Sequence, residues 1–183
     1  QNFLPTKSSL GRLIPTADKI LLLSGSTSEA TRNQVSYYIN TGMKAIAVSV
    51  DSYIEDPNYL PALWKELKEA DSEILFYTDS LAGAPLSQSP DAAQQLESLF
   101  ADLAVKARSL GYKGFLISGG ETSGAVARAL AWQSYHIGSA LAPGVPLLYP
   151  MEDQDCQVIY KSGNFGQKEF YHTAMQEMRR GDK

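Results

Sequence analysis

The sequence is poor in the residues that most often carry disulfide or metal chemistry. It has a single cysteine, Cys156, and only two histidines, His136 and His172. One cysteine excludes a disulfide within the chain and is typical of a reducing compartment, so we expect a cytoplasmic protein. No zinc-ligand set is apparent in such a sequence. We also find no Ser-His-Asp or Cys-His arrangement of the kind that nucleophilic hydrolases use.

The chain also lacks an excess of basic residues and any long apolar run. Its formal net charge of −4 argues against general binding of nucleic acid, which needs basic surface to neutralise phosphates. No run is long enough to cross a bilayer, and no basic-then-apolar signal segment stands at the start. We therefore expect neither nucleic acid nor a membrane as partner. Because the first residue is Gln rather than Met, we expect a processed chain or a domain excised from a longer protein.

What is present suits a single α/β domain. The 183 residues are 44% hydrophobic, enough to bury a core. Strand and helix patterns alternate from residue 19 onward, which predicts a doubly wound, mostly parallel, Rossmann-like sheet with helices on both faces. Residues 1–18 are predicted to be a lead-in or interdomain linker, 79–91 a long exposed loop and 19–183 the domain. The expected strands are 20–23, 44–50, 74–77, 115–117, 135–137, 147–149 and 158–160, and the expected helices lie near 35–39, 60–67, 96–110, 123–132 and 167–179.

Three apolar strand-like runs reach a Ser-Gly pair and then open into small or polar residues. We call these segments the first turn (24–28), the second turn (118–124) and the third turn (161–166). Glycine lets the backbone turn sharply and lets a ligand approach the main chain, and the start of the following helix favours an anion. In open α/β sheets ligands bind at the carboxyl ends of the strands. Three such turns at one sheet edge predict a phosphate site.

In the first turn, Ser24 and Gly25 lie at the strand end and are the better ligand candidates. Ser26 is followed three residues later by Glu29, a spacing that matches a capping box. For Ser26 alone we therefore favour helix capping over ligand binding.

The second turn contains the most specific signal. Its glycine pair, Gly119 and Gly120, would weaken a strand. Two glycines here therefore indicate a backbone conformation or a close approach to the main chain that other residues would not allow. Glu121 is a candidate to hold a ribose hydroxyl or a magnesium-bound water, and Thr122 a candidate to cap the helix or contact phosphate. A tight turn followed by a capped helix explains the same residues without a ligand, and this segment alone does not decide between the two.

The third turn adds a cation to a glycine turn. Lys161 is a candidate point donor to phosphate, although a lysine beside a turn is most often simply solvated. Gly163 and Gly166 would let main-chain N–H groups converge on an anion. The recurrence of three such turns favours the ligand-binding interpretation.

None of the turns matches the Walker pattern or a strict G-x-G-x-x-G. Asp51 lies at the end of the predicted second strand, about 20 residues past the first turn, where the ribose-binding acid of a dinucleotide site would stand. Two alternatives to a kinase domain thus stay open. One is an NAD(P)-dependent oxidoreductase domain, and the other is a non-catalytic nucleotide- or anion-binding regulatory module.

Taken in order, the three motifs resemble the C-terminal nucleotide-binding domain of the four-carbon acid sugar kinases. They read Ser24-Gly-Ser-x-Ser28, Ser118-Gly-Gly-Glu-Thr-Ser-Gly124 and Lys161-Ser-Gly-Asn-Phe-Gly166. The resemblance runs from about residue 19 to the end and includes the connecting segment 142–147. Thr27 departs from the pattern, because family members often have Cys there.

The resemblance implies an ATP-dependent kinase acting on threonate, erythronate or 3-oxo-tetronate type acids, with Mg²⁺ bridging the phosphates. The family's N-terminal domain, which holds the acid sugar, has no counterpart in these residues. We therefore expect the isolated domain to bind nucleotide but to transfer phosphate poorly or not at all. The catalytic base and any homo-oligomer stay open. The implied nucleotide-site residues are Ser24, Gly25, Ser26, Gly119, Gly120, Glu121, Thr122, Ser123, Lys161, Gly163, Asn164 and Gly166.

Overall fold

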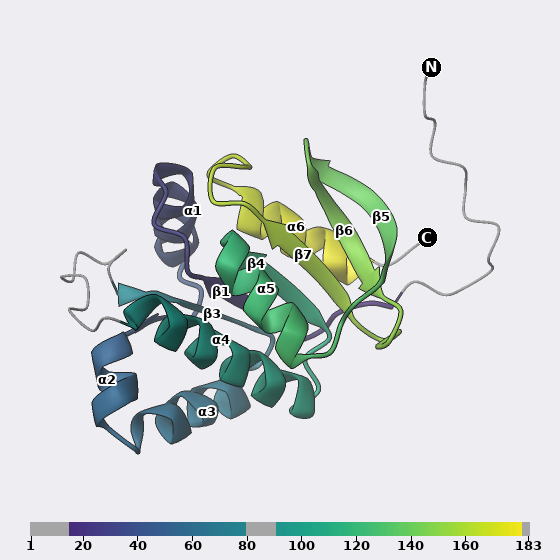
Figure 1. Cartoon of the computed structure of the whole chain (residues 1–183). Coiled ribbons are helices and arrows are strands. Elements are labelled where there is room, and N and C mark those ends of the chain that lie inside the picture. Colours follow the sequence, from purple (N-terminus) through teal and green to yellow (C-terminus); the bar gives the residue numbers. More distant parts are fainter. Residues whose placement is uncertain (1–14, 80–90, 181–183) are drawn as a thin grey trace.

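A computed structural model describes residues 15–79 and 91–180 of the chain, and within them the strands form one seven-stranded sheet (Figure 1). The strand order is β2-β3-β1-β4-β7-β6-β5. The strands β2, β3, β1, β4 and β7 run parallel, whereas β6 is antiparallel to β7 and to β5. The bounds are β1 (Ile20–Ser24), β2 (Ala45–Val48), β3 (Glu73–Thr78), β4 (Gly114–Ser118), β5 (Tyr135–Ala142), β6 (Val145–Pro150) and β7 (Gln157–Lys161).

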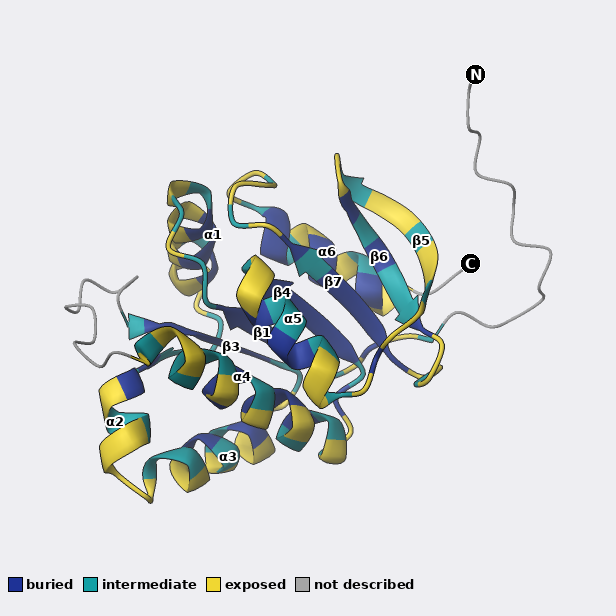
Figure 2. Cartoon of the chain, viewed as in Figure 1, coloured by how far each residue is buried: buried dark blue, intermediate teal, exposed yellow. Residues whose placement is uncertain are grey.

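Helices cover both faces of the sheet. Side chains alternate along β1, so Leu21 and Leu23 pack on one side and Ile20 and Leu22 on the other. All four are fully buried, which explains why the strand reads as a continuous apolar run (Figure 2). Helices α1 (Glu29–Asn40) and α6 (Phe170–Arg180) cover the face of Ile20 and Leu22. Helices α2 (Val50–Glu55), α3 (Tyr59–Glu69), α4 (Ala92–Ser109) and α5 (Gly120–Ala129) lie on the other face.

The predicted fold class is confirmed: the domain is α/β, with a mostly parallel sheet between two helical layers. One predicted boundary is wrong in a way that matters for function. The strand expected over 44–50 ends at Val48, because Ser49 caps a new helix by accepting the N–H of Ser52. Asp51 therefore lies in the first turn of α2, not at a strand end. The predicted loop 79–91 falls, except for its two end residues, outside the described residues.

The part of the predicted lead-in that is described packs against the domain. Ala17 is fully buried, and its N–H donates to the carbonyl of Met178 at the end of α6, at 3.0 Å. The Gln157 side chain donates to the carbonyl of Pro15. Residues 15–18 thus cross the C-terminal end of α6 and lead directly into β1.

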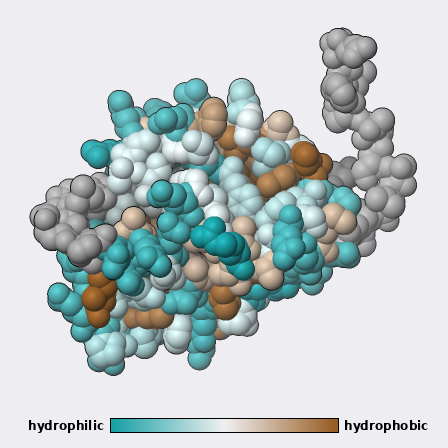
Figure 3. All heavy atoms as spheres, in the orientation of Figure 1, coloured by the Kyte–Doolittle hydropathy of each residue, from teal (hydrophilic) through white to brown (hydrophobic). Residues whose placement is uncertain are grey.

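The hairpin of β5 and β6 forms one edge of the sheet, next to β7. Its turn lies at residues 143–144, inside the connecting segment named above. Ile137 of β5 is 78% exposed, and apolar colour gathers over this region of the surface in Figure 3. No helix in the described ranges 15–79 and 91–180 is long and apolar enough to cross a membrane.

Candidate functional site

The three glycine turns leave adjacent strands at the same edge of the sheet. β4 lies between β1 and β7, and Ser24 pairs with Ser118, which in turn pairs with Lys161. The chain then passes to α1 on one face and to α5 on the opposite face. A point where the connections from neighbouring strands diverge to opposite faces is where open α/β sheets bind ligands.

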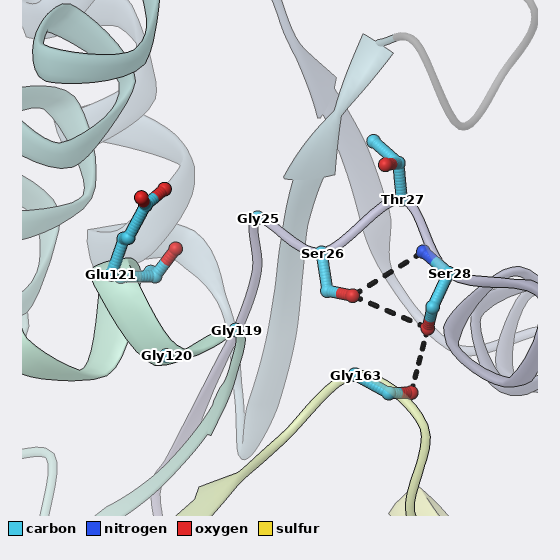
Figure 4. A pocket seen from close by; sticks show the side chains of 9 residues that line it. Gly25, Ser26, Thr27, Ser28, Gly119, Gly120, Glu121 and Gly163 are labelled. Atoms are coloured by element: carbon cyan, nitrogen blue, oxygen red, sulfur yellow. Dashed lines mark hydrogen bonds between the residues drawn. The ribbon is translucent and has the colours of Figure 1, made fainter.

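A pocket of about 530 Å³ lies between the turns (Figure 4). All three turns contribute to it. Its lining residues are Gly25, Ser26, Thr27, Ser28, Gly119, Gly120, Glu121, Thr122 and Gly163. Most of the residues implied by the sequence are thus brought together. Those that do not line the pocket are Ser24, Ser123, Lys161, Asn164 and Gly166.

Two lining residues, Thr27 and Ser28, were missed as candidates. Both are polar and stand in the first turn directly after Ser26. The signal that could have found them is their position, since a helix N-terminus presents its cap and the residue before it to the same side as its free N–H groups. The sequence shows that turn but not which residue starts the helix.

The second turn presents an uncapped helix end to the pocket. Gly119 precedes α5 with φ of +118° and ψ of 133°, a backbone conformation that L side chains rarely adopt, and no side chain caps the helix. The N–H groups of Gly120, Glu121 and Thr122 belong to the first turn of α5, where no intrahelical partner exists. Ser123 serves the turn itself, because its hydroxyl donates to the Gly119 carbonyl at 2.7 Å. This end of α5 favours an anion.

The first turn corrects the predicted capping box. Ser28, not Ser26, caps α1, because the Ser28 Oγ accepts the N–H of Thr31 at 3.3 Å. Ser26 lies two residues before the cap, and its Oγ accepts the N–H of Ser28 at 3.3 Å. The Ser26 side chain therefore lies in the pocket beside Ser28, as Figure 4 shows. This placement favours ligand binding over capping for Ser26.

Glycine is required where the turns touch one another. A Cβ on Gly25 would lie 2.2 Å from the Thr122 Oγ1, and a Cβ on Gly163 would lie 2.1 Å from the Ser26 Oγ. Both distances are far below contact distance. The glycine backbone of one turn therefore packs directly against a side-chain hydroxyl of another turn, which leaves main-chain groups close to the pocket.

Ser24 lies beneath the pocket, not in it. Its side chain is fully buried, and the Tyr171 hydroxyl of α6 lies 3.3 Å from the Ser24 Oγ and 2.8 Å from the Ser118 Oγ. Strand alternation turns both serines toward the α1 and α6 face. Burial raises the pKa of the Tyr171 hydroxyl, which stays neutral. Tyr171 thus joins the carboxyl ends of β1 and β4 directly under the first and second turns.

We expect Tyr171→Phe to lower the free energy of unfolding by about 1–3 kcal/mol, because it leaves two buried serine hydroxyls without their partner. Tyr38→Phe is the matched control. Its ring packs edge-on against that of Tyr171, but its buried hydroxyl has no hydrogen-bond partner among the described residues. Denaturant titration should show little loss for Tyr38→Phe, and equal losses for the two variants would contradict the bridging role.

Lys161 is neither solvated nor part of the pocket lining. It is only 1% exposed, and its Nζ donates to the carbonyls of Ser162 at 3.0 Å and Gly163 at 3.2 Å. No ion pair forms between Lys161 and an acidic side chain within the described ranges. Burial lowers the pKa of the Lys161 ammonium to about 8. The ammonium thus contacts the third turn itself, and its direct contact with phosphate stays a prediction.

Glu121 is the acidic residue in the pocket lining. It stands exposed on the first turn of α5, across from the first turn (Figure 4). No group of three or more His, Cys, Asp and Glu side chains that could hold a metal ion occurs in the parts of the chain that the structure describes. A metal at this pocket would thus take most of its ligands from a bound molecule and from water.

The geometry removes the feature on which the dinucleotide alternative depended. Asp51 is exposed on α2, after β2, and β3 separates β2 from β1. Two strand spacings, about 10 Å, therefore lie between β2 and the strand that carries the first turn. A ribose-binding acid would have to stand at the strand next to β1.

Comparison with known proteins agrees with the motifs. The family model described as "Nucleotide-binding C-terminal domain" matches residues 21–171. The 3-oxo-tetronate kinases of Haemophilus influenzae and Actinobacillus succinogenes are each 34% identical to this chain over 92% of its length. A crystal structure of a Haemophilus influenzae protein is 33% identical, with a TM-score of 0.80 over 90% of this chain. The chain spans about two fifths of these proteins, 42% of each kinase and 41% of the solved chain.

Proposed function

The chain belongs to the nucleotide-binding C-terminal domain family of the four-carbon acid sugar kinases, and we propose that its own part in such a kinase is to bind ATP. The observation that carries this proposal is the uncapped start of α5, which faces the first turn across the pocket. Its free N–H groups and positive dipole end suit a phosphate chain. Calorimetric titration with magnesium-ATP tests the proposal.

In the proposed complex, main-chain groups of the glycine turns hold the phosphates. The N–H groups of Gly120 and Glu121 donate from the helix end, and the Ser26 hydroxyl donates from the opposite side. The backbone of Gly163 lies on the third side of the bound phosphates. Because these contacts come from fixed backbone, little reorganisation accompanies binding, and such pre-organised donors stabilise the charge of a transferring phosphoryl group.

Magnesium fits this pocket as a companion of the nucleotide. The ion keeps several waters in most sites and is bound by one or two carboxylates together with substrate phosphates. We propose that Glu121 contributes the carboxylate, directly or through a bound water. When bound, the ion would neutralise phosphate charge, and the lining residues would orient the phosphates.

The acceptor is proposed to be the hydroxyl of a four-carbon acid sugar, as the names of the related kinases suggest. The remaining three fifths of those relatives would hold the acid, so phosphoryl transfer by this chain alone should be negligible. Positioning of both substrates supplies most of the acceleration in such reactions. A non-catalytic regulatory module would stay inactive even after a sugar-binding half is supplied, whereas a kinase domain would gain activity. That the protein is located in the cytoplasm, and that it can form a homo-oligomer, both stay predictions.

We expect Asp51→Ala to leave the affinity for magnesium-ATP unchanged within about twofold, a difference of about 0.4 kcal/mol. Asp51 stands on α2, two strands away from β1. An oxidoreductase domain that used Asp51 for ribose would instead bind NAD and lose that binding in the variant. Titration of wild type and Asp51→Ala with both nucleotides distinguishes the two functions.

A further inference from the structure

The third turn directs two of its carbonyl groups toward side-chain donors of the first turn, of α1 and of Lys161. The Gly163 carbonyl accepts from the Ser28 hydroxyl at 2.7 Å, from the Thr31 hydroxyl at 3.0 Å and from the Lys161 Nζ at 3.2 Å. The Ser162 carbonyl accepts from the same Nζ at 3.0 Å. Two successive carbonyls of the turn thus converge on one ammonium group.

Gln34 of α1 continues this pattern along the rest of the turn. Its side chain is fully buried, and its Nε2 donates to the carbonyls of Phe165, Gly166 and Gln167 at 2.9, 3.0 and 3.1 Å. The carbonyls of Phe165, Gly166 and Gln167 therefore face α1, as the Gly163 carbonyl does.

Peptide planarity converts inward carbonyls into outward N–H groups. A trans peptide directs its C=O and the following N–H to opposite sides, and the described residues contain no cis peptide. Since the carbonyls of Ser162 and Gly163 face the Lys161 ammonium, the N–H groups of Gly163 and Asn164 point away from it. Gly163 lines the pocket and Asn164 does not, so the N–H of Gly163 is the donor that the third turn can offer to an anion.

Among the described residues, no charged side chain forms a hydrogen bond or ion pair with the Lys161 ammonium. α1 contributes the Thr31 hydroxyl at 3.5 Å from the Nζ, and on β4 the neighbour of Lys161 in register is Ser118, whose Oγ accepts from the neutral Tyr171 hydroxyl of α6. The lowered pKa of Lys161 has desolvation as its cause, with no contribution from a neighbouring charge. A protonated Lys161 thus leaves net positive charge beneath the turn, and this charge favours an anion above it.

We propose that Lys161 is a positioning residue for the anion site: its buried ammonium holds the carbonyls of Ser162 and Gly163, and so fixes the third turn with the N–H of Gly163 directed toward the bound ligand. The assignment of an anion to this pocket rests on the proposed function. The effect of Lys161 on the turn does not, because it exists in the protein without ligand.

The first test uses ligand-free protein labelled with ¹⁵N. Lys161→Met removes the ammonium and keeps most of the side-chain length, and Lys168→Met, at a residue whose ammonium is mostly exposed, removes a charge near the same turn. We expect the amide signals of Gly163 and Asn164 to shift in Lys161→Met and to stay in place in Lys168→Met. Unchanged amide signals in Lys161→Met would overturn the proposal, even if the variant bound ATP poorly, because Lys161 would then act on phosphate directly.

The second test follows the pH dependence of the wild-type protein. Below pH 8 the ammonium is charged and holds the carbonyls, and above it the amine is neutral. We expect the Gly163 and Asn164 amide signals to titrate with a midpoint near this pKa, and the affinity for magnesium-ATP to fall by about tenfold as pH rises through it. Lys161→Met should bind weakly at every pH. If this variant does not fold, the wild-type titration decides alone, and amide signals that do not titrate would contradict the proposal.

The free energy of unfolding should change with pH in the direction opposite to the affinity. This difference distinguishes a positioning role of Lys161 from a general structural role. An unfolded lysine keeps its proton to about pH 10.4, so between that pH and 8 the unfolded state binds more protons and the folded state gains stability as pH rises. We expect wild type to gain stability relative to Lys161→Met in this window while its affinity falls. A parallel loss of stability and affinity would overturn the proposal. If wild type binds no ATP at any pH, the proposed function fails, and the amide signals still test Lys161.

Discussion

Gly120→Val is expected to abolish binding of magnesium-ATP while the domain keeps its fold. Gly120 lines the pocket at the start of α5, and a Cβ there meets no atom within 4 Å, so the added side chain extends into open space. It would occupy the volume where a phosphate must approach the helix end. We expect the loss of affinity to exceed the range that calorimetry can follow, where each tenfold loss corresponds to about 1.4 kcal/mol.

Gly124→Ala is the matched control for this variant. Gly124 lies on the same helix one turn further on, does not line the pocket, and a Cβ there meets only the flexible end of Arg128. Replacing a helical Gly by Ala should raise the free energy of unfolding by about 0.5–1 kcal/mol and leave binding unchanged. Calorimetry and thermal unfolding of both variants check the pair. Normal affinity in Gly120→Val would remove the end of α5 from the site.

Gly25→Ala is expected to damage both the pocket and the fold. Its Cβ would lie 2.2 Å from the Thr122 Oγ1 and 3.2 Å from the Phe100 Cε2. Because the Thr122 side chain is buried and has little room to turn away, we expect the first turn and α5 to move apart, at a cost of about 1–3 kcal/mol. Because the same movement separates the phosphate-binding groups, affinity for magnesium-ATP should fall together with the free energy of unfolding.

A double-mutant cycle identifies the clash as the cause. Thr122→Ala removes the Oγ1, and the next nearest Thr122 atom, its Cβ, lies 3.5 Å from the added methyl group, an ordinary contact. The Gly25→Ala, Thr122→Ala double variant should therefore recover at least about 1 kcal/mol relative to the sum of the two single changes. Additive losses, measured by denaturant titration, would show that Gly25 is needed for another reason.

The sequence was informative about the turns because each one joins a buried strand to a helix. An apolar run such as 20–23 ends where glycine and serine begin, and in a parallel sheet every such end lies at the same edge. The sequence therefore predicted that the turns lie at one edge of the sheet, and it predicted a ligand pocket at that edge. The adjacency of β1, β4 and β7 was not predictable, since it depends on long-range strand pairing.

The sequence did not show to which face of the sheet the last side chain of each strand points. Ser24 and Lys161 are the last residues of β1 and β7, and strand alternation places both on the buried α1 and α6 face. A shift of one residue would have turned both side chains to the opposite face of the sheet. Ser26 was assigned to the cap for a similar reason, because the capping-box spacing fits it although α1 starts after Ser28.

The structure also changes which glycine gives a clean test. The sequence gives no reason to prefer one over the other, because Gly120 and Gly163 both stand in predicted glycine turns. A Cβ on Gly163 would lie 2.1 Å from the Ser26 Oγ and 2.9 Å from the Ser28 Oγ, so valine there would also distort the first turn. Gly120 alone of the two separates binding from folding.

The central claim is that the three turns form one phosphate-binding pocket for ATP. The measurement that tests it most directly is calorimetric titration of the 183-residue chain with magnesium-ATP, with NAD as the control nucleotide and Gly120→Val as the control protein. We predict binding of ATP to wild type, no binding of NAD, and no binding of ATP to the variant. Binding of NAD in preference to ATP, or equal affinity of wild type and Gly120→Val for ATP, would contradict the claim.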